Sequence, residues 1–199
     1  MADNKSGRDE QADDSEKRQR ERDLATELKR RDEPEPPIDP DSLARLEADL
    51  GALRFPTTGS AIVAAVGDNR IESPDETHTV AELLPDTDGE SFRSPSAVRQ
   101  RVKRPSVAAV MKRIVETGET VRGVDPDESQ RDAYERTLQE LRAIDADDDD
   151  EGVAVIGDWV ITQAQLNGAF PGSRSVRRQA AKFCRANGYE IRNDEWLGI

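Results

Sequence analysis

Apolar residues recur along the chain at intervals of three and four positions, a spacing typical of amphipathic helices. The clearest case is Val107, Val110, Met111 and Ile114, which form a single stripe at i, i+3, i+4 and i+7. Helices are also expected where a capping residue precedes apolar positions. The expected helices span residues 43–50, 61–66, 80–84, 95–102, 105–118, 127–146 and 173–187. The expected caps are Asp41 or Ser42, Thr57 or Thr58, Thr77 or Thr79, Ser94, and Ser173 or Ser175.

Residues 153–161 have a different pattern, because two β-rich runs flank the pair Gly157-Asp158. Glycine at the first turn position is typical of a type II′ hairpin. A short helix at 162–170, a turn, the helix at 173–187 and a strand at 189–191 would follow. This order of hairpin, helix, turn, helix and strand resembles a winged helix-turn-helix unit.

Composition divides the chain into four parts. Residues 1–38 are charged, almost lack apolar side chains and end in a proline-rich run, so we expect a disordered tail. The other parts are a helical domain at 39–118, a linker at 119–151 with an exposed helix and an acidic turn, and a small α+β unit at 152–199. The predicted class is mainly α, with the α+β unit at the end.

The charge balance is strongly acidic, with a formal net charge of −13 and a pI near 4.6. The bases are 23 Arg and only 6 Lys, beside 23 Asp and 19 Glu. Acidic chains with few lysines are typical of archaea that hold molar potassium chloride in the cell, where carboxylates retain water and keep like-charged molecules apart. The alternative is an ordinary acidic protein with a disordered tail.

The location that we expect is the cytoplasm. No apolar stretch follows the first residues, so a signal peptide is not expected. The longest apolar runs, such as 61–66, are far shorter than the roughly 20 residues of a membrane helix. The single cysteine, Cys184, excludes a disulfide within the chain.

Side chains suited to catalysis are scarce. The only histidine, His78, lies near an expected helix start, and Cys184 lies on the apolar side of its helix. The sequence has no Cys/His cluster for zinc, no phosphate-binding loop and no dinucleotide-binding glycine motif. We therefore expect neither an enzyme nor a bound cofactor or metal.

Two long windows lack acidic residues altogether. Residues 91–115 have a net charge of +7 and residues 159–189 a net charge of +5, so the rest of the chain carries −25. One interpretation is that these bases bind an anionic partner. The alternative is that they pair with acidic segments of the same chain, such as 147–151 or the N-terminal tail.

The second window has a regular geometry, because its bases fall within about 140° of one helix circumference and Val176, Ala180, Phe183 and Cys184 fall opposite. Exposed arginine could contact phosphates or guanine edges of DNA or RNA. The candidate nucleic-acid-binding residues are Arg174, Arg177, Arg178, Lys182 and Arg185, with Arg99, Arg101, Lys103 and Arg104 from the first window. The second hypothesis is a protein-interaction or adaptor module that docks on an acidic protein.

Several motifs between residues 40 and 117 resemble a known family. They are Leu53-Arg-Phe-Pro56, Ile62-Val-Ala-Ala-Val-Gly-Asp68, Val80-Ala-Glu-Leu-Leu84, Ser91-Phe-Arg-Ser-Pro95 and Val98-Arg-Gln-Arg-Val-Lys-Arg-Pro105. Together they are similar to a family of small haloarchaeal proteins without an assigned function. A broader prokaryotic family with a Phe-Pro opening is more weakly similar. The resemblance implies a compact helical domain in a salt-adapted protein, and it implies no activity.

Overall fold

The computed structural model describes residues 38–73, 76–121, 125–144 and 151–189. They belong to one compact unit that spans residues 36–199. The tail at 1–37, the acidic turn at 145–150 and the strand beyond residue 189 lie outside the described residues, so these expectations stay predictions.

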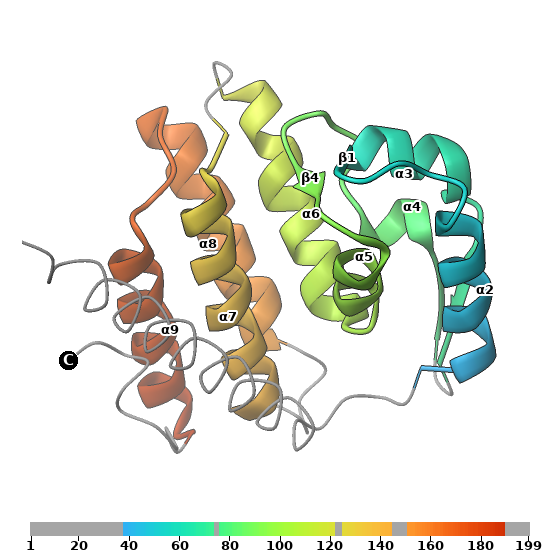
Figure 1. Ribbon diagram of the computed structural model, residues 1–199. Coiled ribbons are helices and arrows are strands. Elements are labelled where there is room, and N and C mark those ends of the chain that lie inside the picture. Colours follow the sequence, from blue (N-terminus) through green and yellow to red (C-terminus); the bar gives the residue numbers. More distant parts are fainter. Residues whose placement is uncertain (1–37, 74–75, 122–124, 145–150, 190–199) are drawn as a thin grey trace, which may run out of the picture. The chain divides into compact units, whose positions relative to one another are not determined.

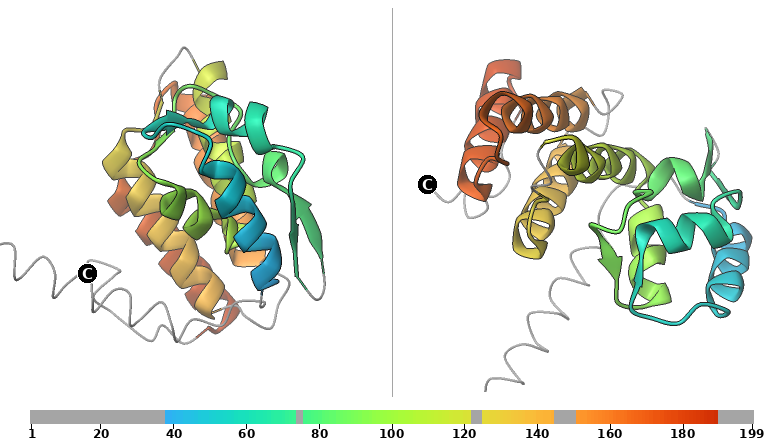
Figure 2. Two further views of the ribbon diagram at one scale, coloured as in Figure 1. Left: turned by 45° about the vertical axis from the view of Figure 1, so that its right-hand side comes forward. Right: turned by 90° about the horizontal axis from the view of Figure 1, so that it is seen from above.

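The mainly α prediction is confirmed, since eight helices make up most of the described part of the chain. They are α2 (Pro40–Leu50), α3 (Gly59–Val66), α4 (Val80–Leu83), α5 (Pro95–Val102), α6 (Pro105–Thr120), α7 (Glu128–Ile144), α8 (Glu151–Asn167) and α9 (Ser173–Asn187). Figure 1 shows α6 in the middle, with α2 to α5 on one side of it and α7 to α9 on the other, and Figure 2 shows the same order from above.

Four short strands occur where no strand was predicted. β1 (Thr57–Thr58) pairs antiparallel with β4 (Ser91–Phe92). β2 (Arg70–Glu72) pairs antiparallel with β3 (Thr77–Thr79), and Ile71 faces His78 across this pair. Strands of two or three residues are too short for an alternating pattern to show in the sequence.

Local capping chemistry sets the helix starts. Thr58, Thr79 and Ser94 each accept a hydrogen bond from a first-turn N–H, as predicted. At α2 the prediction is corrected, because the cap is Asp39, whose carboxylate accepts from the N–H groups of residues 41 and 42. Pro40 then occupies the first helical position, where its missing N–H costs nothing.

The apolar side chains form two clusters, and α6 belongs to both. The first cluster joins α2 to α5 and includes Ala108 of α6. The second joins α6 to α9 and includes Val107, Met111 and Ile114 of α6. The predicted division at residues 118 and 152 stays a prediction, and α6 itself continues past Gly118 to Thr120.

The hairpin predicted at 153–161 is wrong, because these residues lie within the single helix α8. Val153, Ile156, Val160 and Ala164 are all buried at helical spacing. Gly157 is not a turn residue but a point of close helix packing. A Cβ added to Gly157 would lie 2.2 Å from Cγ1 of Val110 on α6. Burial against α6 therefore overrides the β-propensity of the valines and isoleucines.

The helix expected within the linker is present as α7, and its apolar side is buried rather than exposed. Tyr134, Leu138 and Leu141 belong to the second cluster. The Tyr134 hydroxyl donates a hydrogen bond to the Pro171 carbonyl, which holds the connection between α8 and α9 against α7. Among the described residues, no helix is both long and apolar enough to cross a membrane.

Candidate functional site

Helix α9 is amphipathic, with a buried side that fixes its orientation. It begins after Gly172 and ends at Gly188, whose φ of 76° is the left-handed conformation that glycine adopts readily. Val176, Ala180 and Cys184 are buried in the second cluster. Helix α9 packs against both α7 and α8 (Figure 1), and the residues on its opposite side are exposed.

The exposed side of α9 carries a row of cations that we call the α9 stripe: Arg174, Arg178, Lys182 and Arg185. At 100° per residue the four positions fall within about 80° of the helix circumference, and they extend over about 16 Å of its axis. None of the four forms an ion pair with another described residue. The stripe is therefore a solvent-facing row of positive charge.

Arg177, the fifth candidate of this helix, does not belong to the stripe. It is half-buried and lies outside the 80° arc, beside the buried side of α9. It also makes an interaction within the chain. Arg177 thus has a structural environment that differs from that of its four neighbours.

The basic window at 91–115 behaves differently, because its bases pair with acids from other parts of the chain. Arg99 lies 3.5 Å from a carboxylate oxygen of Glu47 on α2. The other exposed or half-buried pairs are Arg93 with Glu128, Lys112 with Glu116, and Arg113 with Asp158. These bases therefore balance charge within the chain, as the alternative interpretation expected, but their partners here are not the N-terminal tail or 147–151 that it named.

Arg101 is a correction to the candidate set, because it is buried and only 7% exposed. Its guanidinium lies 2.9 Å from Glu90 and 3.2 Å from Glu135 on α7, and it stacks over the ring of Phe92 at 5.7 Å. Burial lowers the pKa of Arg101, but attraction by Glu135 and Glu90 outweighs this effect and raises the pKa overall. A buried cation that is held by two carboxylates cannot take part in a binding surface.

The two remaining candidates of this window are half-buried. Lys103 is the C-cap residue of α5, and Arg104 precedes Pro105 at the start of α6. Arg104 makes an interaction within the chain. The structure therefore brings four of the nine candidates into one exposed row and places the other five elsewhere.

A family model covers the part of the chain that holds the first cluster. Residues 40–117 match DUF5789, a family of unknown function. The resemblance to an uncharacterised family is confirmed, while a salt-adapted origin stays a prediction. The DUF5789 segment runs from α2 into α6 and ends well before the α9 stripe. No curated protein and no solved structure matches the chain significantly.

Other exposed cations without an ion pair to a described residue belong to several different elements. Three of them belong to the DUF5789 segment: Arg45 on α2, Arg54 in the following loop and Arg70 on β2. Each belongs to a different element, and acids lie close to Arg45 in the sequence at Glu47 and Asp49. They come from three different elements rather than from one helix face, and this makes them suitable controls for the α9 stripe.

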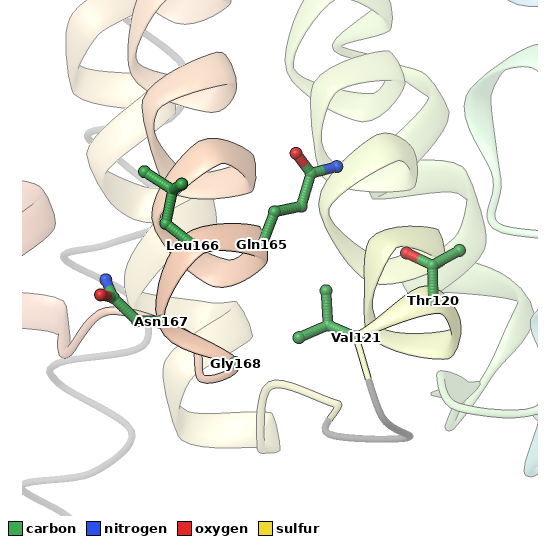
Figure 3. A pocket seen from close by; sticks show the side chains of 6 residues that line it. All are labelled: Thr120, Val121, Gln165, Leu166, Asn167 and Gly168. Carbon is green, nitrogen blue, oxygen red and sulfur yellow. The ribbon is translucent and has the colours of Figure 1, made fainter.

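A cavity lies between the ends of α6 and α8 (Figure 3). Its volume is about 380 Å³, and it is lined by Thr120, Val121, Gln165, Leu166, Asn167 and Gly168. None of these side chains ionises near neutral pH.

The histidine and the cysteine lie elsewhere. His78 is on β3, with Nε2 3.0 Å from Glu76. Cys184 is fully buried. In the described ranges no group of three or more His, Cys, Asp or Glu could hold a metal.

Proposed function

We propose that the chain is a non-enzymatic, nucleic-acid-associated protein and that the α9 stripe is its contact surface. The observation that carries this proposal is a row of four exposed cations without an ion pair to a described residue, in a chain with a net charge of −13. Phosphates attract such a row because each contact releases counterions from the nucleic acid. Backbone contacts of this kind supply most of sequence-independent affinity.

The contrast between the two basic windows supports an external partner for the second one. Bases at 91–115 form ion pairs with carboxylates of the same chain, among them those of Glu47, Glu90 and Glu135. The window at 159–189 contains no acid, and the α9 stripe has no acidic partner in the described part of the chain. If the stripe served only charge balance, it would be expected to pair as the first window does.

The experiment is equilibrium binding of fluorescent DNA and RNA to the purified chain at low salt. The stripe variant combines Arg174→Gln, Arg178→Gln and Arg185→Gln. We expect it to lose at least about tenfold in affinity, because three phosphate contacts disappear and surface charge contributes little to the fold. Circular dichroism at each salt concentration checks that both proteins remain folded, since an acidic chain repels itself more strongly at low salt.

A matched control removes the same charge from scattered sites, with Arg45→Gln, Arg54→Gln and Arg70→Gln. Both variants have the same net charge, so a general charge effect would weaken both equally. The proposal expects the control to bind within about twofold of the original chain. Unchanged binding by a folded stripe variant, or equal losses in both variants, would contradict it.

The second candidate is an adaptor that docks on an acidic protein. Exposed apolar side chains on α8 favour it, because Val155 is 39% and Leu166 75% exposed. Eleven positions separate them, so they lie within about 20° of one helix face. After nuclease treatment, an adaptor would still copurify with a protein, and both the stripe variant and Leu166→Ser would reduce that copurification. Loss of all partners on nuclease treatment would count against the adaptor.

A further inference from the structure

We infer that the α9 stripe binds the phosphate backbone of a double-stranded nucleic acid, in preference to a single strand and without reading its sequence. This inference rests on the proposed function and deepens it by naming the class of nucleic acid. It follows from the length of the row, from its neighbours on α9 and from the position of the aromatic side chains.

Charge density favours a duplex. The stripe extends over about 16 Å, and B-form DNA carries one negative charge per about 1.7 Å of its axis when both strands are counted. A duplex therefore presents about ten phosphate charges along the stripe, whereas one strand with a rise of about 3.4 Å presents about five. A row of fixed cations is attracted more strongly to the denser of these charge arrays.

The stripe also lacks the aromatic surface on which single strands stack. Proteins that bind single strands combine cations with exposed aromatic rings, and each stacked base contributes about 1–3 kcal/mol. The aromatic residues at this end of α9 are Phe183 and Tyr189, whose rings stack on each other with centroids 6.1 Å apart. Both are partly buried against the second cluster. Within the described residues, the arc of the stripe contains cations alone.

Small side chains border the stripe and fit contact with a backbone. At 100° per residue, the exposed residues Ser175 and Ala186 lie just beyond one edge of the arc, whereas Ala181, just beyond the other edge, is buried. No asparagine or glutamine, the usual readers of adenine, lies within the arc. Arginine can contact guanine edges, so the comparison of two duplexes with unrelated sequences tests whether the stripe reads sequence. Because the opposite side of α9 is packed into the core, the four cations form a preorganised row.

The test measures affinity against salt for the full chain with three probes. These are two duplexes of about 20 base pairs with unrelated sequences, longer than the stripe, and a single strand of the same length. Four phosphate contacts predict a slope of log K against log salt of about −3.6 on a duplex, or a loss of about 150-fold between 50 and 200 mM salt. Each single substitution of a stripe cation by glutamine should reduce the slope by about 0.9.

The expected result is similar affinity for the two duplexes and at least about tenfold weaker binding of the single strand. Equal or tighter binding of the single strand, or a tenfold preference for one duplex, would overturn the inference alone. A slope that the stripe substitutions leave unchanged would overturn the proposed function as well, because the stripe would then not be the contact surface. Absence of binding to all three probes would instead remove the proposed function on which it rests. The variant Arg45→Gln should leave the slope unchanged.

Discussion

At the scale of single residues, whether a cation is buried or exposed depends on which carboxylates the fold brings near it. Arg101 and Arg178 are both arginines in acid-free windows, yet one is buried and the other exposed. Arg101 contacts Glu90 and Glu135, which lie 11 and 34 positions away in the sequence. Such distant partners leave no local signal, so the sequence could not separate Arg101 from the surface candidates. For α9 the helical spacing placed Arg174, Arg178, Lys182 and Arg185 on the exposed side, although it also included the half-buried Arg177.

The buried cluster around Arg101 gives a residue-scale prediction. Arg101→Met would leave Glu90 buried with only the Arg131 guanidinium nearby, at 4.0 Å. Removing one partner of a buried ion pair leaves an uncompensated charge, so we expect the free energy of unfolding to fall by about 3–5 kcal/mol. Denaturant unfolding followed by circular dichroism measures this change.

Arg99 supplies the control for that prediction, because its pair with Glu47 is half-exposed. Arg99→Met should cost no more than about 1 kcal/mol, as solvent-exposed ion pairs contribute little. If the two substitutions cost the same, the cluster around Arg101 is not the buried network that we describe.

At the scale of elements, most helix positions could be predicted from the sequence, whereas the hairpin predicted at 153–161 is a helix in the structure. The starts of α3, α4 and α5 follow from capping residues that the sequence displays. At α9 the predicted cap was wrong, because the N-cap is Gly172, without a side-chain hydrogen bond, and not Ser173 or Ser175. The region of α8 contains both a β-rich composition and a helical spacing of Val153, Ile156, Val160 and Ala164. Only contact with α6 decides between the two, and that contact depends on residues more than 40 positions away.

Close packing of α6 on α8 gives an element-scale prediction. A methyl group at Gly157 would clash with Val110, so Gly157→Ala should destabilise the fold by about 1–3 kcal/mol despite the higher helix propensity of alanine. Adding Val110→Ala makes room for the methyl group. The double variant should therefore be more stable than the sum of the two single effects by at least about 0.5 kcal/mol. Additive effects in thermal or denaturant unfolding would refute this contact.

At the scale of the whole molecule, α6 and Arg101 connect the DUF5789 segment to the helices that follow it. Val107, Met111 and Ile114 lie within residues 40–117, but they pack with α7, α8 and α9. Glu135, which pairs with Arg101, also lies outside the segment. The family match therefore covers a part of a larger packed structure.

A truncated chain tests this dependence. A fragment of residues 36–121 would expose the apolar side of α6 and leave Arg101 with one carboxylate fewer. We expect the fragment to lose cooperative unfolding and part of its helical signal in circular dichroism. Cooperative unfolding of the fragment at the midpoint of the full chain would show that the segment is self-sufficient.

The central claim at this scale is that an acidic molecule presents one exposed cationic helix face to nucleic acid. The most direct measurement is ultraviolet cross-linking in cells that produce the chain, followed by mass spectrometry of nucleotide-linked peptides. We expect adducts on peptides within 173–187 and none on residues 99–104, whose bases are half-buried or paired within the chain. Absence of attached nucleic acid, or adducts confined to residues 91–115, would contradict it.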